Sequence, residues 1–276
     1  MNQDISICVL TENEMGWTEP FELDKVQILD NYYLSAQKSD IAFLKKMDTA
    51  RLLAGFRTTA GIDTKGVRPY GGWEDSLLGG HCVGHYLTAL AQAVKVTGDK
   101  ELKEKSQTLI AGLEECQKKL GTGFLFGAKV EDKEDVEKQF DILEGKKKGE
   151  TWVPWYNMHK VLAGLVDTYK YTGNETALLV AEKLGDWIYE RVSKWDLKTN
   201  QKVLETEYGG MNDCLYELYS YSHNKHHLEA AQKFDEKALF LMAAKGEKNC
   251  LDGKHANTQI PKFIGAIKRY NVLKQL

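Results

Sequence analysis

The 276-residue sequence contains no basic block long enough to follow a phosphate backbone, no closely paired cysteines and no long apolar run. Its 37 basic and 40 acidic residues are interspersed and leave a formal net charge of −3. Proteins that bind a nucleic-acid backbone usually gather Lys and Arg on one face or in one segment. The sequence therefore predicts no nucleic-acid partner.

The cysteines are odd in number and widely separated, and none forms the C-x-x-C pair that is typical of zinc knuckles and redox motifs. We expect all five to be reduced thiols: Cys8, Cys82, Cys116, Cys214 and Cys250. The N-terminal segment carries acidic residues where a secretory signal has a basic stretch followed by an apolar one. No later segment is apolar over a membrane-spanning length. These absences predict a cytoplasmic protein that does not bind membranes.

The chain shows no alternation of strands and helices, and helical periodicity dominates it. Residues 31–56 predict one long helix or two abutting ones. After a glycine-rich loop, helices follow in pairs, and Gly98-Asp99 and Gly173-Asn174 provide a stop and a start between members of a pair. The predicted ranges are 81–97 with 99–120, 156–172 with 174–188, 211–223 with 226–244, and a last helix from about 258.

Helical pairs with small, apolar first helices and more amphipathic second helices predict an all-α fold. We expect an (α/α)6-type toroid of inner and outer helices, incomplete in this chain, with residues 1–276 forming one partial domain. The polar segment 131–150 is predicted to be an exposed insertion. Only three short pieces resemble strands, at 5–10, 123–130 and 151–154.

Each first helix begins with a cluster of glycine, aromatic and polar residues. The clusters are Gly79 to His85, Trp155 to His159, Glu207 to Asp213, and His255 to Gln259. Alternate helices of successive hairpins run parallel, so the four clusters should meet at one end and line a pocket. Imidazole, amide and aromatic groups beside helix N-termini suit sugar hydroxyls and ring faces. Taken singly, Asp213 or Thr258 could equally be an ordinary helix cap.

Spacing alone assigns no catalytic residue. His81 and His85 are four residues apart, but the helix lacks the Glu of H-E-x-x-H and no third ligand is evident, so we predict no metal site. The acids near the pocket are Glu74, Asp75, Glu207 and Asp213, and none can be paired at a catalytic separation from sequence. Cys82 and Cys214 lie near inner-helix starts, where a thiolate can be stabilised, although buried structural cysteines are commoner.

Several motifs together resemble glycoside hydrolase family 127 and its relative family 146. They are Tyr70-Gly71-Gly72-Trp73-Glu74, Gly79-Gly80-His81 with Gly84-His85-Tyr86-Leu87, Tyr156-Asn157-Met158-His159-Lys160, Glu207-Tyr208-Gly209-Gly210-Met211-Asn212, and His255-Ala256-Asn257-Thr258-Gln259-Ile260-Pro261-Lys262. This resemblance implies a β-L-arabinofuranosidase-like enzyme with an (α/α)6 barrel that acts with retention on arabinose-containing plant glycans. It also implies a sugar subsite lined by His85, His159, Glu207, Asn212, His255 and Gln259.

In those families the acid Glu and the nucleophilic Cys, which shares a zinc ion, follow the last of these motifs, whereas this chain ends at Leu276. We therefore expect a truncated chain that is inactive alone, holds no zinc and self-associates through the open side of its barrel. Two alternatives remain. One is a non-catalytic carbohydrate-binding or assembly fragment, and the other is a sugar epimerase or isomerase that uses His159 and His255 as acid and base.

Overall fold

The computed structural model describes residues 20–130, 132–246 and 250–273. Across these residues the chain is helical and contains no β-strand, so the strand-like pieces at 123–130 and 151–154 are loops, and 5–10 lies outside the described residues. The α-helices are α1 (Asn31–Lys46), α2 (Thr49–Thr59), α3 (His81–Thr97), α4 (Lys100–Leu120), α5 (Lys138–Leu143), α6 (Pro154–Thr172), α7 (Glu175–Val192), α8 (Leu197–Leu204), α9 (Met211–Ser222), α10 (Lys225–Lys233), α11 (Lys237–Ala244) and α12 (Ala256–Leu273). Two short 3-10 helices, η1 (Leu23–Lys25) and η2 (Gly72–Asp75), precede α1 and α3.

The predicted stop and start signals define the helical pairs. Gly98 ends α3 with a φ of 67°, a left-handed conformation that favours glycine, and the Asp99 side chain accepts a hydrogen bond from the backbone N–H of Leu102 at 3.1 Å to begin α4. Gly173 and Asn174 repeat this arrangement between α6 and α7. These local signals confirm the predicted boundaries of both hairpins.

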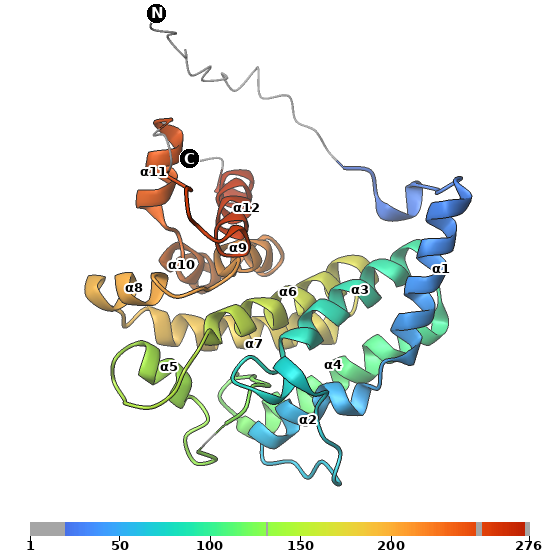
Figure 1. Cartoon of the computed structure of the whole chain (residues 1–276), viewed down its shortest axis with the longest axis horizontal. Coiled ribbons are helices and arrows are strands. Elements are labelled where there is room, and N and C mark those ends of the chain that lie inside the picture. The colour runs from blue at the N-terminus through green and yellow to red at the C-terminus, as the bar shows by residue number, and fades with distance from the viewer. Residues whose placement is uncertain (1–19, 131, 247–249, 274–276) are drawn as a thin grey trace, which may run out of the picture.

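Helices α3, α6, α9 and α12 form an inner row, and α4, α7 and α10 pack behind it (Figure 1). Near the start of α3 and α6, Asn157 Nδ2 donates a hydrogen bond to the carbonyl of Gly79 at 3.2 Å. Nearly three turns further along, Thr88 Oγ1 donates to Asp167 Oδ2 at 2.7 Å. Residue numbers rise together on both helices, so the two helices are parallel.

The same direction holds for α9 and α12. Asn212 Nδ2 donates to the carbonyl of Lys262 at 3.2 Å, and Glu217 pairs with Lys268 further along both helices. Lys170 of α6 pairs with Glu217 at 3.0 Å and links the middle of the row. The inner helices therefore begin at one end of the molecule, as the paired-helix pattern predicts, and the fold is an all-α arrangement of toroid type.

Helices α3 and α6 approach each other closely because each carries a glycine at the crossing point. A Cβ atom added to Gly84 would lie 1.9 Å from the carbonyl oxygen of Lys160, and one added to Gly164 would lie 2.5 Å from the carbonyl oxygen of Gly84. Distances this short do not occur between non-bonded atoms, so backbone contact here depends on glycine. This contact fixes the relative height of the two helix N-termini.

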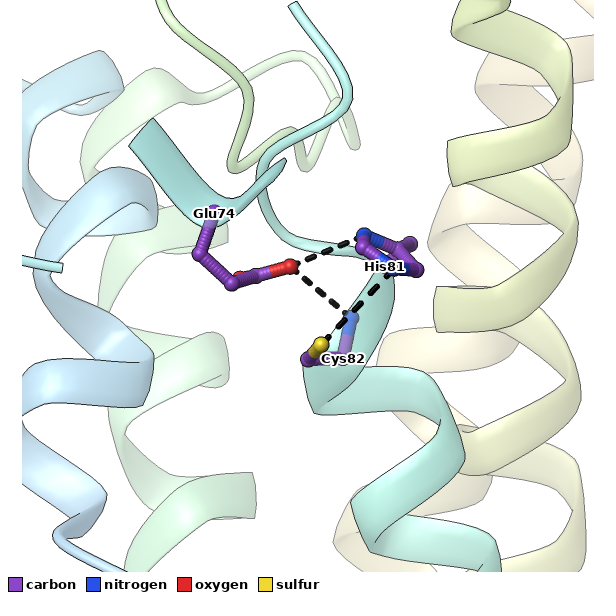
Figure 2. A group of neighbouring side chains, drawn as sticks. All are labelled: Glu74, His81 and Cys82. Atoms are coloured by element: carbon purple, nitrogen blue, oxygen red, sulfur yellow. Dashed lines mark hydrogen bonds and ion pairs between the residues drawn. The ribbon is translucent and has the colours of Figure 1, made fainter. Parts of the chain in front are cut away.

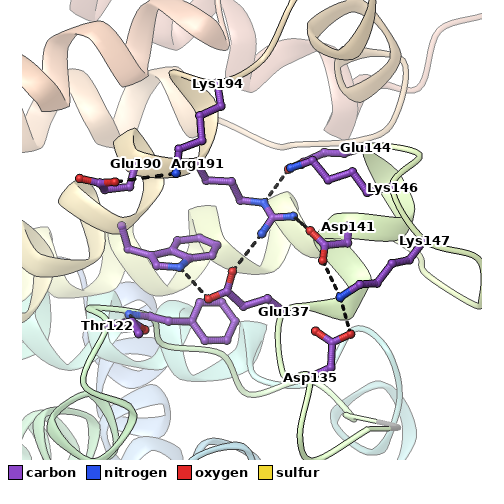
Figure 3. A network of polar contacts seen from close by, with 12 residues as sticks. Thr122, Asp135, Glu137, Asp141, Glu144, Lys146, Lys147, Glu190, Arg191 and Lys194 are labelled. Atoms are coloured by element: carbon purple, nitrogen blue, oxygen red, sulfur yellow. Dashed lines mark hydrogen bonds and ion pairs between the residues drawn. The ribbon is translucent and has the colours of Figure 1, made fainter.

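The described part of segment 131–150, which the sequence predicts to be an exposed insertion, is exposed at residues 132–134 and 145–150 and packed at its centre. Its helix α5 places Phe140 in the core, where the ring packs against Trp155 and Trp187. Arg191 of α7 binds the carboxylates of three acids from the segment (Figure 3): Glu137, Asp141 and Glu144. Lys146 also pairs with Glu144, and Lys147 with Asp141, so three cations balance the three acids. These ion pairs thus allow a charged stretch to pack, while Lys146 to Glu150 remain exposed.

The third outer helix also differs from the prediction, since the expected helix 226–244 is divided. Helix α10 ends at Lys233 and α11 begins at Lys237, because the intervening Asp235 turns inward. The Asp235 carboxylate accepts hydrogen bonds from Tyr216 at 2.7 Å and from Asn212 at 3.4 Å. A helical continuation would carry this carboxylate away from its partners in the inner row.

One side of α12 is apolar and uncovered within the described residues. Ile260, Ile264 and Ile267 lie at helical spacing and are 60%, 48% and 65% exposed. None of the described helices combines the length and the apolar character needed to cross a membrane.

Candidate functional site

Aromatic and imidazole rings gather where the inner helices begin. His81, the first residue of α3, lies 6.3 Å from Trp73 of η2, 6.2 Å from His85 and 6.4 Å from Tyr156 of α6, measured between ring centroids. Trp73 is 66% exposed although it is a large apolar side chain, and His85 is exposed as well. Their rings are therefore available to a ligand.

Polar groups from α6, α9 and α12 extend this cluster. The Lys160 ammonium lies 4.6 Å from the centre of the Tyr156 ring. Asn257, at the start of α12, donates a hydrogen bond to Glu207 Oε1 at 3.1 Å and lies within hydrogen-bonding reach of Tyr156. We call Trp73, His85, Tyr156, Lys160, Glu207 and Asn257 the inner-end cluster. It brings together residues that are up to 184 positions apart because four helices begin at the same end.

The electrostatics of the inner-end cluster keep the His85 imidazole neutral. Partial desolvation, together with the positive charges of Lys160 and His81, lowers the pKa of His85 to about 4. Burial also lowers the pKa of Lys160 from its ordinary value. Next to the cluster on α9, burial raises the pKa of Asp213 to about 6. At neutral pH, His85 is therefore both a donor and an acceptor for hydroxyl groups.

Two of the predicted subsite residues lie inside the protein instead. His159 is 7% exposed, and its Nδ1 accepts a hydrogen bond from the backbone N–H of Gly210 at 3.0 Å. Asn212 is fully buried between α9 and α12, where its amide bonds Asp235 and the backbone of Lys262. Asn212 is thus a helix-packing residue, which corrects the prediction that it contacts the sugar.

The other predicted residues are divided between two surfaces. His85 and Glu207 belong to the inner-end cluster. His255 is exposed directly before α12, where its carbonyl accepts the backbone N–H groups of Thr258 and Gln259. Gln259 lines a separate open groove of about 1220 Å³ between α8, α11 and α12. In the sequence, all four of these residues lie near the start of an inner helix. Gln259 nevertheless faces the groove and not the inner-end cluster, because it lies on a different side of its helix.

Trp73, Tyr156, Lys160 and Asn257 are absent from the predicted subsite, although each belongs to a motif. One signal could have identified two of them. Tyr156 and Lys160 are four residues apart at the start of one helix, so they share a face. His159 is adjacent in sequence and points to the other side.

Glu74, His81 and Cys82 form the one compact group of metal-ligand types among the described residues, with one ligand atom of each within 4.8 Å of the others. Figure 2 shows the imidazole in contact with both the carboxylate of Glu74 and the thiol of Cys82. Glu74 Oε1 is 2.8 Å from His81 Nδ1, whereas Cys82 Sγ is 3.7 Å from His81 Nε2. A histidine binds a metal through one nitrogen, and here each nitrogen faces a different partner.

The fold defines a class of protein: an all-α arrangement of paired helices of toroid type, with polar and aromatic side chains gathered where the inner helices begin. Residues 25–275 match the family described as β-L-arabinofuranosidase, GH127 catalytic domain. The chain belongs to this family.

A solved structure and the curated proteins add little further detail. The crystal structure of Ara127N-Se, a GH127 β-L-arabinofuranosidase from Geobacillus stearothermophilus T6, is similar at 18% identity with a TM-score of 0.47 over 82% of this chain. The match covers 33% of that protein, so this chain spans about a third of its length. No curated protein matches the sequence.

Proposed function

We propose that this chain forms a carbohydrate-binding face of a β-L-arabinofuranosidase-like glycoside hydrolase, and that its ligand is an L-arabinofuranoside. The observation that carries the proposal is the inner-end cluster, in which an exposed indole lies beside neutral imidazole, amide, ammonium and carboxylate groups. An exposed aromatic face packs against sugar C–H groups, and the polar groups bind hydroxyls. Family membership supports a glycoside as the ligand class.

We further propose that this face binds sugar but does not cleave the glycosidic bond alone. Retaining hydrolysis needs a nucleophile and an acid on opposite sides of the bond. The family resemblance assigns a cysteine nucleophile, the acid Glu and a zinc ion to positions that follow the H-A-N-T-Q-I-P-K motif. The buried position of His159, with Nδ1 already bonded to Gly210, argues against its use as an acid or base by an isomerase.

Calorimetric titration with an L-arabinofuranosyl disaccharide tests this proposal. We expect Trp73→Ala and His85→Ala to weaken binding about tenfold each, since each removes a stacking or hydrogen-bonding partner. Leu179→Ala, on exposed surface of the outer helix α7, should leave binding unchanged. The same chain should not release p-nitrophenol from p-nitrophenyl β-L-arabinofuranoside. Equal binding by all three variants would contradict the site, and hydrolysis by the chain would contradict the non-cleaving role.

A further inference from the structure

Each of Cys82, His81 and Glu74 contacts the other two at the start of α3 (Figure 2). His81 Nδ1 lies 2.8 Å from Glu74 Oε1 and 2.8 Å from the carbonyl oxygen of Leu78. Both of these oxygens are acceptors, so Nδ1 carries the hydrogen. Whenever the ring is neutral, its lone pair is therefore on Nε2, which faces Cys82 Sγ at 3.7 Å. Burial opposes a charge on the ring, but the hydrogen bonds with Cys82 and Glu74 outweigh it and raise the pKa of His81 to about 10, so Nε2 readily takes the proton of the thiol.

Glu74 is held rigidly and remains ionised. Its Oε2 accepts the backbone N–H of Gly80 at 3.0 Å, and its Oε1 accepts that of Cys82 at 3.2 Å. Burial opposes ionisation, but the hydrogen bonds from His81, Gly80 and Cys82 outweigh it and hold the pKa of Glu74 below its ordinary value. Glu74 can therefore orient His81 and stabilise a positive imidazolium, as the acid of a nucleophile–base–acid triad does.

The other described cysteines lack this environment or this exposure. Cys116 and Cys214 are buried, and burial raises the pKa of Cys116 to about 12 and that of Cys214 well above its ordinary value. Cys82 is partly exposed and is the second residue of α3, where the helix dipole favours a thiolate. Cys250 is partly exposed too, but it lies in a loop before α12. The reactivity of Cys250 is therefore the internal reference for the reactivity of Cys82.

We propose that Cys82 is a nucleophilic thiol, activated by His81 and Glu74, that forms thioethers with α,β-unsaturated carbonyl compounds entering beside Trp73 and Tyr156. Its proton passes to His81 Nε2 as the sulfur lone pair forms an S–C bond at the β-carbon. The C=C π electrons move to the α-carbon as an enolate, which then takes the proton from His81. Atoms and charge balance without another reactant.

Acrylamide is a suitable probe, and peptide mass spectrometry of the full chain measures the alkylation rate at each cysteine. We expect Cys82 to react at least about tenfold faster than Cys250. His81→Gln should lower the Cys82 rate about a hundredfold and Glu74→Gln about tenfold, with the Cys250 rate unchanged as an internal control for folding. The Cys82 rate of the unmutated chain should also change with pH less steeply than that of the His81→Gln variant.

Two results would overturn the proposal. One is a Cys82 rate equal to that of Cys250, or a Cys82 rate that neither substitution changes. The other is stoichiometric binding of added zinc that is lost in Cys82→Ser and that protects Cys82 from acrylamide, which would make the three residues a metal site. If added zinc does not protect Cys82 from acrylamide, the result supports proton transfer from Cys82 to His81.

Discussion

The ring of His159 lies directly against the Gly209-Gly210 turn, and its Nδ1 accepts the backbone N–H of Gly210 at 3.0 Å. Gly209 has a φ of 60°, and a Cβ atom there would lie 2.4 Å from His159 Nδ1. Gly209 and Gly210, in the motif that begins at Glu207, therefore make room for His159, in the motif that begins at Tyr156. This contact fixes the loop that carries Glu207 into the inner-end cluster.

The buried His159 should make stability depend on pH. Burial, reinforced by the charges of Lys160 and His85, holds the pKa of His159 well below its ordinary value of 6.5. Below pH 6.5 the unfolded chain binds a proton that the folded chain excludes. The free energy of unfolding therefore falls by up to about 1.4 kcal/mol for each unit by which the pH is lowered. Urea titrations between pH 7.5 and about 5 measure this slope.

His159→Asn is the matched variant, because its side-chain oxygen can accept from Gly210 but does not titrate. We expect the variant to show a flatter pH dependence over the same range, with His85 contributing equally to both proteins. An unchanged slope would show that His159 is protonated in the folded protein.

The glycine contact between α3 and α6 should not tolerate a methyl group. Gly84→Ala would force Cβ to within 1.9 Å of the Lys160 carbonyl, so we expect a loss of about 3 kcal/mol in the free energy of unfolding. Gly71→Ala is the control, since Gly71 has a φ of −67° and a Cβ atom added there would meet no other atom within 4 Å. Similar urea midpoints for both variants would contradict backbone contact at Gly84.

Arg191 should be necessary for the packing of segment 131–150. Arg191→Met leaves the fully buried Glu144 carboxylate without the guanidinium, so we expect a loss of about 3 kcal/mol or more. Lys194→Met is the control, because Lys194 is exposed and lies 3.9 Å from Glu190, and it should have no measurable effect. Limited proteolysis gives a second measurement, with faster cleavage after Lys138 expected only in Arg191→Met.

The uncovered side of α12 should promote self-association. Ile264→Lys places a charge in the stripe formed by Ile260, Ile264 and Ile267, and we expect it to lower the apparent mass measured by light scattering. Leu179→Lys makes the same change at an exposed site on α7 and should have no effect. A monomeric unmutated chain at high concentration would refute this expectation.

The sequence predicts the features that depend on near neighbours. Gly98 with Asp99, and Gly173 with Asn174, set helix boundaries through backbone conformation and capping bonds that involve only a few residues. The shared end of the inner helices also follows from the order of the hairpins, since alternate helices must run parallel. The family resemblance adds the ligand class, which composition and periodicity alone do not provide.

The tertiary structure decides which polar residues face solvent and which are buried. Arg191 binds three acids of segment 131–150 beside the buried Phe140, although the composition of this segment predicts exposure. Asn212 and Gln259 both lie near helix starts, yet packing buries one between helices and turns the other into a separate groove. Local sequence cannot determine these outcomes, because burial depends on which side of a helix meets a neighbour far away in the chain.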